Sequence, residues 1–241
     1  MVFLWIILGV LGGVLGLIIG YVLFLILITA FVPKKEYEKV SGFYRALFNF
    51  TAGLVIRLLN IKVKVNGKEK IDAVKGRFLL VSNHRSNFDP ILTYYAFRKK
   101  GLAFVSKPEN FKIIVASGFM RKCCFIPIDR ENPRNALKAL RKASELIKND
   151  VVSMGIYPEG TRSKECKLLE FHDGVFKIAQ MAKVPVVVMT IKNTENIYKR
   201  KFLGKIVIDI DVLDVIDAKT VEEKTTHELS LIARKSMENN L

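Results

Sequence analysis

The fold of this chain is decided by one stretch, FLLVSNHRSNFDP, which occupies residues 78–90. Its first four residues form an apolar run with the length of a buried strand. Asp89 and Pro90 predict that a helix follows, with Asp89 as its N-cap and Pro90 at its first position, where the missing N–H costs little. The stretch therefore predicts a strand, a polar turn and a helix, and it puts His84 at the exposed end of the strand.

The turn in this stretch brings His84 towards the carboxylate of Asp89. A carboxylate beside a histidine fixes the imidazole tautomer and stabilises the imidazolium, which is the arrangement of a general base. The same two residues also suit a helix cap and a polar strand end. A metal site is disfavoured, because a catalytic zinc ion usually has three protein ligands and His172 and His227 lie far along the chain.

Outward from this stretch, strand-like and helix-like segments alternate, which predicts an α/β domain with a central, mixed sheet flanked by helices. The expected strands are 61–65, 78–82, 102–106, 124–128, 151–157, 185–191 and 205–213. The expected helices are 42–60, which is amphipathic, 90–99, 133–149, 174–183 and 221–239. Asn132 is expected to cap the helix from Pro133, and Thr220 with Glu223 predicts a capping box for the last helix.

The first 32 residues carry no charged side chain. This run is longer than the roughly 20 residues that cross a bilayer as a helix, and it lacks the basic start of a signal peptide. We interpret it as a retained membrane segment that either spans once or dips in and returns, with a cleaved signal peptide as the minor alternative. Lys34 and Lys35, which follow it, place the next domain on the cytoplasmic face.

The chain of 241 residues is long enough for one full-sized domain and a small appendage. We divide it into residues 1–60, a membrane anchor with an amphipathic helix, and residues 61–241, the α/β domain. Its net charge of +16 all follows residue 32, which suits membrane phospholipids or phosphate-bearing substrates. No nucleic-acid-binding motif is present, so nucleic acid is not expected as a partner. Cys123, Cys124 and Cys166 do not form a disulfide framework and are expected to be reduced.

Four blocks in this chain are similar to those of the glycerolipid acyltransferases related to 1-acylglycerol-3-phosphate acyltransferase. His84 to Asp89 resembles the HxxxxD motif of that family. The other three blocks are FIPIDR at 125–130, YPEGTRS at 157–163 and VPVVV at 184–188. They occur in the order of the family and cover about the middle half of the chain, which makes the match specific. One difference is that the family often has Phe-Lys-x-Gly where this chain has Phe-His-Asp-Gly at 171–174.

The resemblance implies a role for each block. His84 is the implied catalytic base and Asp89 its partner. The residues implied to bind the substrate are Lys107, Arg130, Glu159, Gly160, Thr161 and Arg162. Of these, Arg130 and the EGTR block would hold the phosphate of the acceptor, whereas Lys107 is equally typical of an exposed surface lysine. His172 remains open between a role in head-group or donor preference and a simple capping or surface role.

The activity implied is transfer of a fatty acyl group from acyl-CoA or acyl carrier protein to the sn-2 hydroxyl of lysophosphatidic acid. No metal and no other cofactor is expected. Glycerol-3-phosphate or another lysophospholipid is an alternative acceptor. A non-catalytic membrane protein that binds phosphatidic acid is a different class of function, as is a phosphohydrolase with His84 as nucleophile. Intact His84 and Asp89 argue against the binding protein, and the lack of an evident second acid argues against the phosphohydrolase.

Overall fold

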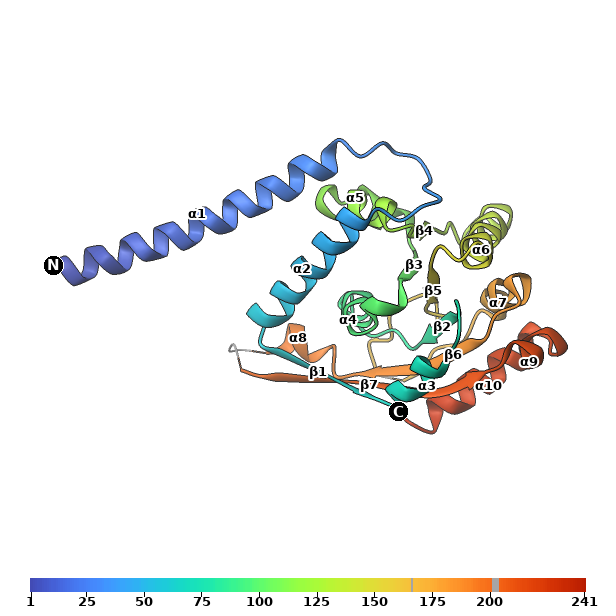
Figure 1. The fold of residues 1–241 in the computed structure, drawn as a ribbon. Coiled ribbons are helices and arrows are strands. Elements are labelled where there is room, and N and C mark those ends of the chain that lie inside the picture. Colours follow the sequence, from blue (N-terminus) through green and yellow to red (C-terminus); the bar gives the residue numbers. More distant parts are fainter. Residues whose placement is uncertain (166, 201–203) are drawn as a thin grey trace.

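The chain folds into a seven-stranded sheet with helices on both faces, and one long helix projects from it (Figure 1). This computed structural model describes residues 1–165, 167–200 and 204–241, so Cys166 lies outside the described residues. The strands are β1 Ile61–Asn66, β2 Leu79–Ser82, β3 Leu102–Ser106, β4 Ile126–Pro127, β5 Ser153–Ile156, β6 Val186–Lys192 and β7 Ile206–Ile216.

The strands lie in the order β1-β7-β6-β2-β5-β3-β4. Neighbouring strands are parallel except β6 and β7, which are antiparallel, so the prediction of a mixed central sheet is confirmed. β2 lies between β6 and β5, which puts the turn that begins at Asn83 directly beside the segment that follows β5. The carboxyl ends of parallel strands meet at one edge of a sheet, and this edge is where α/β proteins bind ligands.

Alternating side chains of β2 point into two separate cores, as the two-residue period of a strand requires. Leu79 and Val81 are buried in the core on one face, and Phe78 and Leu80 in the core on the other. A strand that is buried on both faces is apolar throughout, which explains why this run was recognisable in the sequence.

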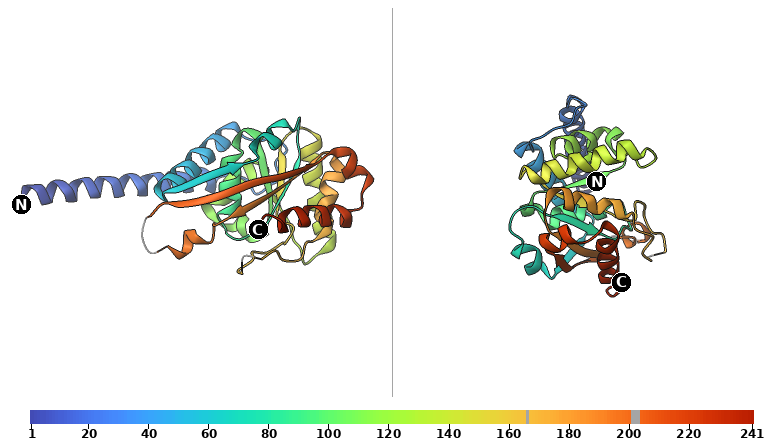
Figure 2. Two further views of the ribbon diagram at one scale, coloured as in Figure 1. Left: turned by 90° about the horizontal axis from the view of Figure 1, so that it is seen from below. Right: turned by 90° about the vertical axis from the view of Figure 1, so that its right-hand side faces the viewer.

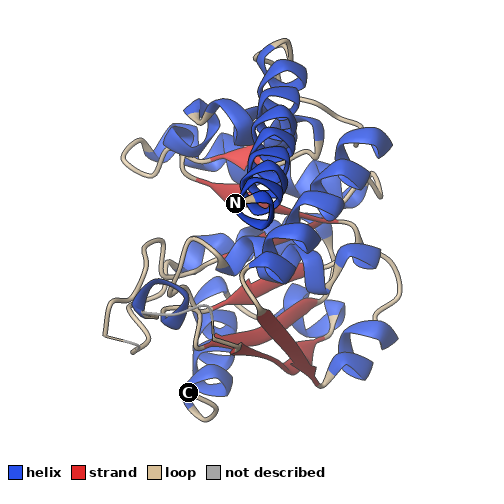
Figure 3. Cartoon of the chain, turned by 90° about the vertical axis from the view of Figure 1, so that its left-hand side faces the viewer, coloured by secondary structure: helices blue, strands red, loops and turns tan. Residues whose placement is uncertain are grey.

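The helices divide between the two faces of the sheet (Figures 1 and 3). One face is covered by α6 Pro133–Lys148, α7 Lys177–Ala182, α9 Ala218–Glu223 and α10 Thr226–Glu238. The other is covered by α2 Gly42–Leu58, α3 Lys68–Ala73 and α4 Asp89–Ala96. The remaining elements are α1 Val2–Ala30, α5 Ile114–Lys122, α8 Asn196–Lys199 and the 3-10 turns η1 Arg98–Lys100, η2 Pro108–Lys112 and η3 Asp173–Phe176.

Two predicted helix starts differ from the structure. The N-cap of α4 is Phe88, and Asp89 is already helical because its carboxylate turns back to the preceding turn instead. The predicted helix 221–239 is two helices, separated at Lys224, whose backbone is extended. The capping box belongs to Thr225 and Glu228, not to Thr220, whose backbone N–H and hydroxyl both donate to Asp217.

Other predicted element boundaries also differ from those in the structure. The predicted strand 124–128 is reduced to β4, because Cys124 takes a positive φ of 60° that no strand residue adopts. Predicted helix 174–183 begins as η3, and predicted helix 90–99 ends at Ala96 before η1. The capping of α6 is as predicted, since the Asn132 side chain accepts hydrogen bonds from the backbone N–H groups of Arg134 and Asn135.

Helix α1 contacts the body of the protein only through its last turns, and its N-terminal part projects away (Figure 2). Residues 1–20 are all exposed, whereas Leu25 and Thr29 are buried. Gly118 of α5 allows this contact, because a Cβ at that position would lie 2.8 Å from the Cα of Thr29. At about 1.5 Å of rise per residue, the exposed part is about 30 Å long, close to the thickness of a bilayer core. Among the described residues, α1 is the one helix long and apolar enough to cross a membrane.

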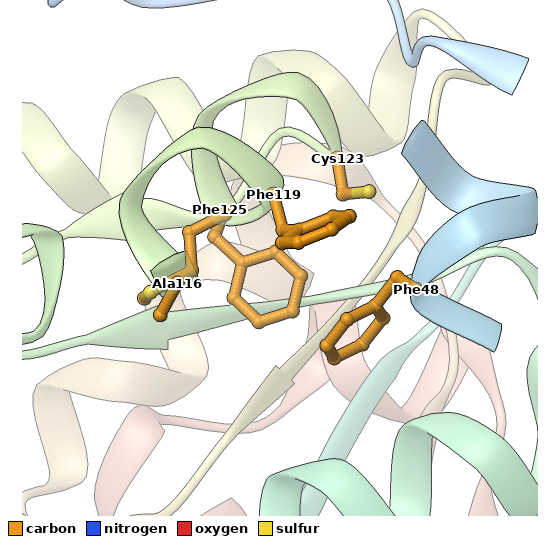
Figure 4. A pocket seen from close by; sticks show the side chains of 6 residues that line it. Phe48, Ala116, Phe119, Cys123 and Phe125 are labelled. Atoms are coloured by element: carbon orange, nitrogen blue, oxygen red, sulfur yellow. The ribbon is translucent and has the colours of Figure 1, made fainter. Parts of the chain in front are cut away.

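A small cavity separates α2 from α5 (Figure 4). Its walls are Phe48, Ala116, Phe119, Met120, Cys123 and Phe125, and its volume is about 40 Å³. The lining is apolar, so we expect the cavity to be dry.

The side chain of Asn83 extends the pairing of β2 with β6 beyond the last backbone pair. Its amide donates to the carbonyl oxygen of Ile191 over 3.0 Å, and its Oδ1 accepts from the N–H of Ile191 over 2.8 Å. Asn83 is buried, so no water replaces it in these contacts. The bond pair fixes the start of the turn that carries His84.

We expect Asn83→Ala to lower the free energy of unfolding by roughly 2–4 kcal/mol, because it leaves two buried backbone groups without partners. Chemical unfolding of the protein in detergent micelles measures this loss. Asn87→Ala is the matched control, since Asn87 is exposed in the same turn. Equal stability of the two variants would contradict a structural role for the Asn83 amide.

Candidate active site

The side chains of His84 and Asp89 meet where β2 ends. The imidazole Nδ1 of His84 lies 2.8 Å from Oδ2 of Asp89. Asp89 is completely buried and His84 is partly exposed, with 18% of its side chain accessible. When the Asp89 carboxylate is ionised it can only accept, so Nδ1 carries the proton and Nε2 is left as the acceptor.

Asp89 Oδ2 also organises the backbone of the turn. It accepts hydrogen bonds from the N–H groups of Arg85 (2.6 Å) and Ser86 (2.8 Å), besides its contact with His84. The carboxylate sits in the first turn of α4, where the helix dipole favours a negative charge. This one oxygen therefore fixes both the turn and the orientation of the imidazole.

The ring of Tyr157 stacks on the imidazole of His84. The two ring centroids are 4.1 Å apart and the planes are 15° apart, and the other face of Tyr157 is stacked on Phe104. Burial, with a smaller contribution from the negative charge of Asp89, raises the pKa of Tyr157 well above its usual value. The phenol therefore stays neutral, and its ring restricts rotation of the imidazole.

The carboxylate of Glu159 joins three segments of backbone. Its Oε1 accepts from the N–H of His84 over 2.7 Å, and its Oε2 accepts from the N–H of Leu169 over 2.9 Å. A second bond between the same loops runs from the N–H of Ser163 to the carbonyl oxygen of His84 over 2.8 Å. Burial raises the pKa of Glu159, and the two N–H donors partly offset this.

Glu159 was expected to bind substrate, but both of its oxygens are occupied by backbone N–H groups. Only 3% of its surface is exposed. Its position supports a structural role, that of holding the end of β5 against the backbone of His84.

Gly160 is in close contact with the side chains of His172 and Arg130. Its φ of +68° is the left-handed conformation that favours glycine. A Cβ at this position would lie 2.9 Å from the His172 ring and 3.2 Å from Nη1 of Arg130. Arg130, from the loop after β4, therefore reaches back to the turn after β5. Burial of part of its guanidinium lowers the pKa of Arg130, although the residue as a whole is exposed, and arginine stays charged regardless.

The other three predicted binding residues are exposed. Thr161 and Arg162 continue the turn after Gly160, and Arg162 makes no ion pair with any described residue. Lys107 follows β3 and is the N-cap of η2. The hydrogen bonds of Glu159 and Ser163 to the backbone of His84 hold the turn after β5 beside the end of β2, and Arg130 reaches Gly160 in that turn. Lys107 lies one strand further along the sheet, because β3 flanks β5 on the side away from β2.

The sequence did not predict the contacts that three further residues make in the site. Tyr157 was treated only as the end of a strand, and Ser163 only as part of a block. His172 was left open, and its contact with Gly160 depends on a loop of 11 residues between them that folds back. The signal available for Tyr157 was its position two residues before Glu159, at the end of a strand adjacent to β2.

The described residues contain no group of three His, Cys, Asp or Glu side chains that would hold a metal ion. Cys123 and Cys124 are free and buried, and burial raises the pKa of each thiol to about 11. Both are therefore protonated at neutral pH and unreactive as nucleophiles.

We expect Glu159→Gln to destabilise the protein by about 1–3 kcal/mol, because the new amide –NH₂ would face a backbone N–H in place of an acceptor. Thermal unfolding in micelles measures the loss, and the amide resonance of His84 should shift as its partner changes. Glu170→Gln, in an exposed position of the same loop, is the control. A Glu159→Gln protein as stable as this control would refute the structural role.

Tyr157→Leu should abolish the ring-current shift on the imidazole of His84, whereas Tyr157→Phe should keep it. The chain has only three histidines, so ¹³C-labelled histidine gives resolvable ring signals that His84→Ala assigns. The measurement is the position of the His84 ring signal in each variant. An unchanged signal in Tyr157→Leu would show that the stack does not exist in solution.

Comparison with known proteins identifies the family to which this chain belongs. Residues 62–192 match the acyltransferase family. A probable 1-acyl-sn-glycerol-3-phosphate acyltransferase of Mycoplasma pneumoniae is 31% identical over 181 residues, which is 69% of this chain and 65% of that protein. The enzyme of that name from Streptococcus pneumoniae is 25% identical over 79% of this chain and 70% of its own length. A third, from Limnanthes douglasii, is 30% identical over 61% of this chain, and the match covers 51% of that protein.

The match thus spans 65% of the Mycoplasma protein and 51% of the Limnanthes protein, less than two thirds of each. Among solved structures, the 1-acyl-sn-glycerophosphate acyltransferase PlsC from Thermotoga maritima matches with a TM-score of 0.64 and 25% identity. The match covers 81% of this chain and 78% of that protein, including the mixed sheet flanked by helices. The family match alone covers more than half of the chain, so this protein belongs to the acyltransferase family.

Proposed function

We propose that this protein transfers a fatty acyl group from an acyl thioester to the sn-2 hydroxyl of 1-acyl-glycerol-3-phosphate, forming phosphatidic acid. The observation that carries the proposal is the His84–Asp89 pair, which is partly open to solvent and lies beside the turn after β5. Relatives named for this reaction, at about 30% identity, support the choice of acceptor.

In the proposed reaction His84 is the general base. Its Nε2 takes the proton of the acceptor hydroxyl as the oxygen attacks the thioester carbonyl. The imidazolium that forms is stabilised by Asp89 through Nδ1. As the tetrahedral intermediate collapses, the carbon–sulfur bond breaks and the thiolate leaves, taking the proton from His84. The acceptor is itself the nucleophile, so no acyl-enzyme is formed.

The phosphate of the acceptor would lie near Gly160. Arg130 is held over this glycine, and Arg162 follows it in the same turn with its guanidinium exposed. A guanidinium presents two parallel N–H groups that match two phosphate oxygens. Gly160 and Thr161 would contribute close approach of the backbone, and Lys107 at the end of β3 would add positive charge.

The acyl donor is acyl-CoA or acyl carrier protein, both of which are acidic and suit a chain with a net charge of +16. The apolar helix α1 would hold the domain at the membrane, where both the acceptor and the product are found. Lys34 and Lys35 directly after the helix favour the cytoplasmic face for the domain.

We expect His84→Ala to lower transfer of a labelled acyl group to lysophosphatidic acid by about 10²- to 10⁴-fold, the usual contribution of a general base. Asp89→Asn should lower it comparably, because the amide no longer stabilises the imidazolium. The measurement uses membranes that contain the full chain, with acyl-CoA and acyl carrier protein as donors in separate assays.

His227→Gln is a matched control for His84. His227 also lies 2.8 Å from an aspartate, Asp173, but it is largely exposed on α10. Its replacement should leave the rate nearly unchanged.

Robust transfer by His84→Ala would exclude His84 as the base. A folded wild-type protein inactive with both donors would be assayed with glycerol-3-phosphate and other lysophospholipids, and release of inorganic phosphate would point to a phosphohydrolase.

A further inference from the structure

His172 is held firmly against the turn that contains Gly160. Its backbone N–H donates to the carbonyl oxygen of Pro158 over 2.9 Å. Three residues earlier, the N–H of Leu169 donates to the buried carboxylate of Glu159. These two bonds fold the segment before η3 back onto the end of β5. The fold therefore fixes the backbone of His172 beside Gly160, and the side chain is exposed.

The ring of His172 and the guanidinium of Arg130 approach the same point above Gly160. Nε2 of His172 lies 3.0 Å, and Nη1 of Arg130 3.2 Å, from the place where a Cβ of Gly160 would be. These distances are shorter than ordinary contacts, so both side chains pack on Gly160 and only a residue without a Cβ fits beneath them. The two nitrogen atoms are therefore close to each other. Because both side chains are exposed, a phosphate group on their solvent side would be within reach of each.

The nearby carboxylates have other partners. Asp129 accepts from the side chain of Asn135 over 3.1 Å, and Glu159 is occupied by two backbone N–H groups. Asp173, which is next to His172 and attracts its positive charge, lies 2.8 Å from Nδ1 of His227 on α10. Among the described residues, neither His172 nor Arg130 forms an ion pair with a carboxylate, so both side chains are available to a phosphate monoester.

We propose that His172 is a further binding residue for the acceptor, which donates a hydrogen bond to its phosphate together with Arg130. This rests on the proposed function, because it adds a residue to the phosphate site described above. The family often has a lysine where this chain has His172, and a lysine is always charged at neutral pH, whereas an imidazole is charged only when protonated. Binding of the phosphate in this protein therefore weakens as the pH rises through the range in which the imidazole loses its proton.

The first test replaces the charge at His172. We expect His172→Gln to raise KM for lysophosphatidic acid by about threefold to tenfold with little change in kcat, as for loss of a partly exposed, charge-assisted hydrogen bond. His172→Lys should restore the KM of the wild type or lower it. The control is His227→Lys, which adds the same charge over Asp173 instead of Gly160. Equal effects of the two lysine variants, or no effect of His172→Gln, would overturn the proposal.

The second test separates the imidazole from every other group that titrates. The ratio of KM in the wild type to KM in His172→Lys is measured between pH 6 and pH 8. Titration of His84 and of the lipid phosphate affects both proteins and cancels in the ratio. We expect the ratio to rise with pH, because only the wild type loses its charge at this position. A ratio independent of pH would contradict the proposal.

The third test does not depend on turnover. Full-length His84→Ala protein with ¹³C-labelled histidine is titrated with glycerol-3-phosphate, a soluble phosphate monoester. We expect the ring signal of His172 to shift towards the protonated form while that of His227 stays in place, and Arg130→Gln should abolish the shift. An unmoved His172 signal would overturn the inference. A wild-type protein without acyl transfer but with this shift would refute the proposed function alone.

Discussion

The carboxylate of Glu159 imposes the constraint on which the site depends. A buried carboxylate is costly unless hydrogen bonds compensate for its lost hydration, and here two backbone N–H groups do so. One belongs to His84, at the end of β2, and the other to Leu169, in the segment that returns to Gly160. A single side chain thus fixes the distance between the imidazole and the turn after β5. Its conservative replacement by glutamine cannot satisfy both donors, so the acid is needed for the geometry of the site rather than for contact with a substrate.

The same physical reasoning distinguishes the two histidine–aspartate pairs of the chain. In both, Nδ1 lies 2.8 Å from a carboxylate oxygen. Asp89 is fully buried, and the same oxygen holds two backbone N–H groups, so His84 is oriented before any substrate arrives. The pair on α10 is exposed to water, which screens its attraction and leaves its side chains free to rotate. Distance alone would not separate a candidate base from a surface contact; burial and the additional donors do.

The sequence predicted the mixed sheet because its central strands are buried on both faces and read as unbroken apolar runs. It failed where tertiary contacts override local pattern. Helix α5 was missed because Gly118 weakens its local helical signal, and this glycine is explained only by its contact with Thr29 of α1. The capping box was predicted at Thr220, but the backbone N–H and hydroxyl of Thr220 both donate to Asp217, and the box forms at Thr225 and Glu228. In the site, the sequence predicted which residues gather but not their contacts, because Glu159, Arg130 and His172 are brought together by strand order and a returning loop.

The direction in which α1 projects bears on how a lipid would reach His84. Helix α8 directly follows β6, and it lies on the side of the sheet towards which α1 extends (Figure 1). Phe88, in the turn between β2 and α4, contacts Tyr198 of α8 with ring centroids 5.5 Å apart, so the same side carries the carboxyl end of β2. Tyr198 is itself exposed, as are Phe50 and Leu58 on α2. If α1 crosses a bilayer, the side of the sheet that carries α8 lies towards the membrane (Figure 1). An acceptor with its acyl chain in the bilayer would then present its glycerol hydroxyl and phosphate to His84 and Arg130 without leaving the lipid, which saves the large cost of transferring an acyl chain into water.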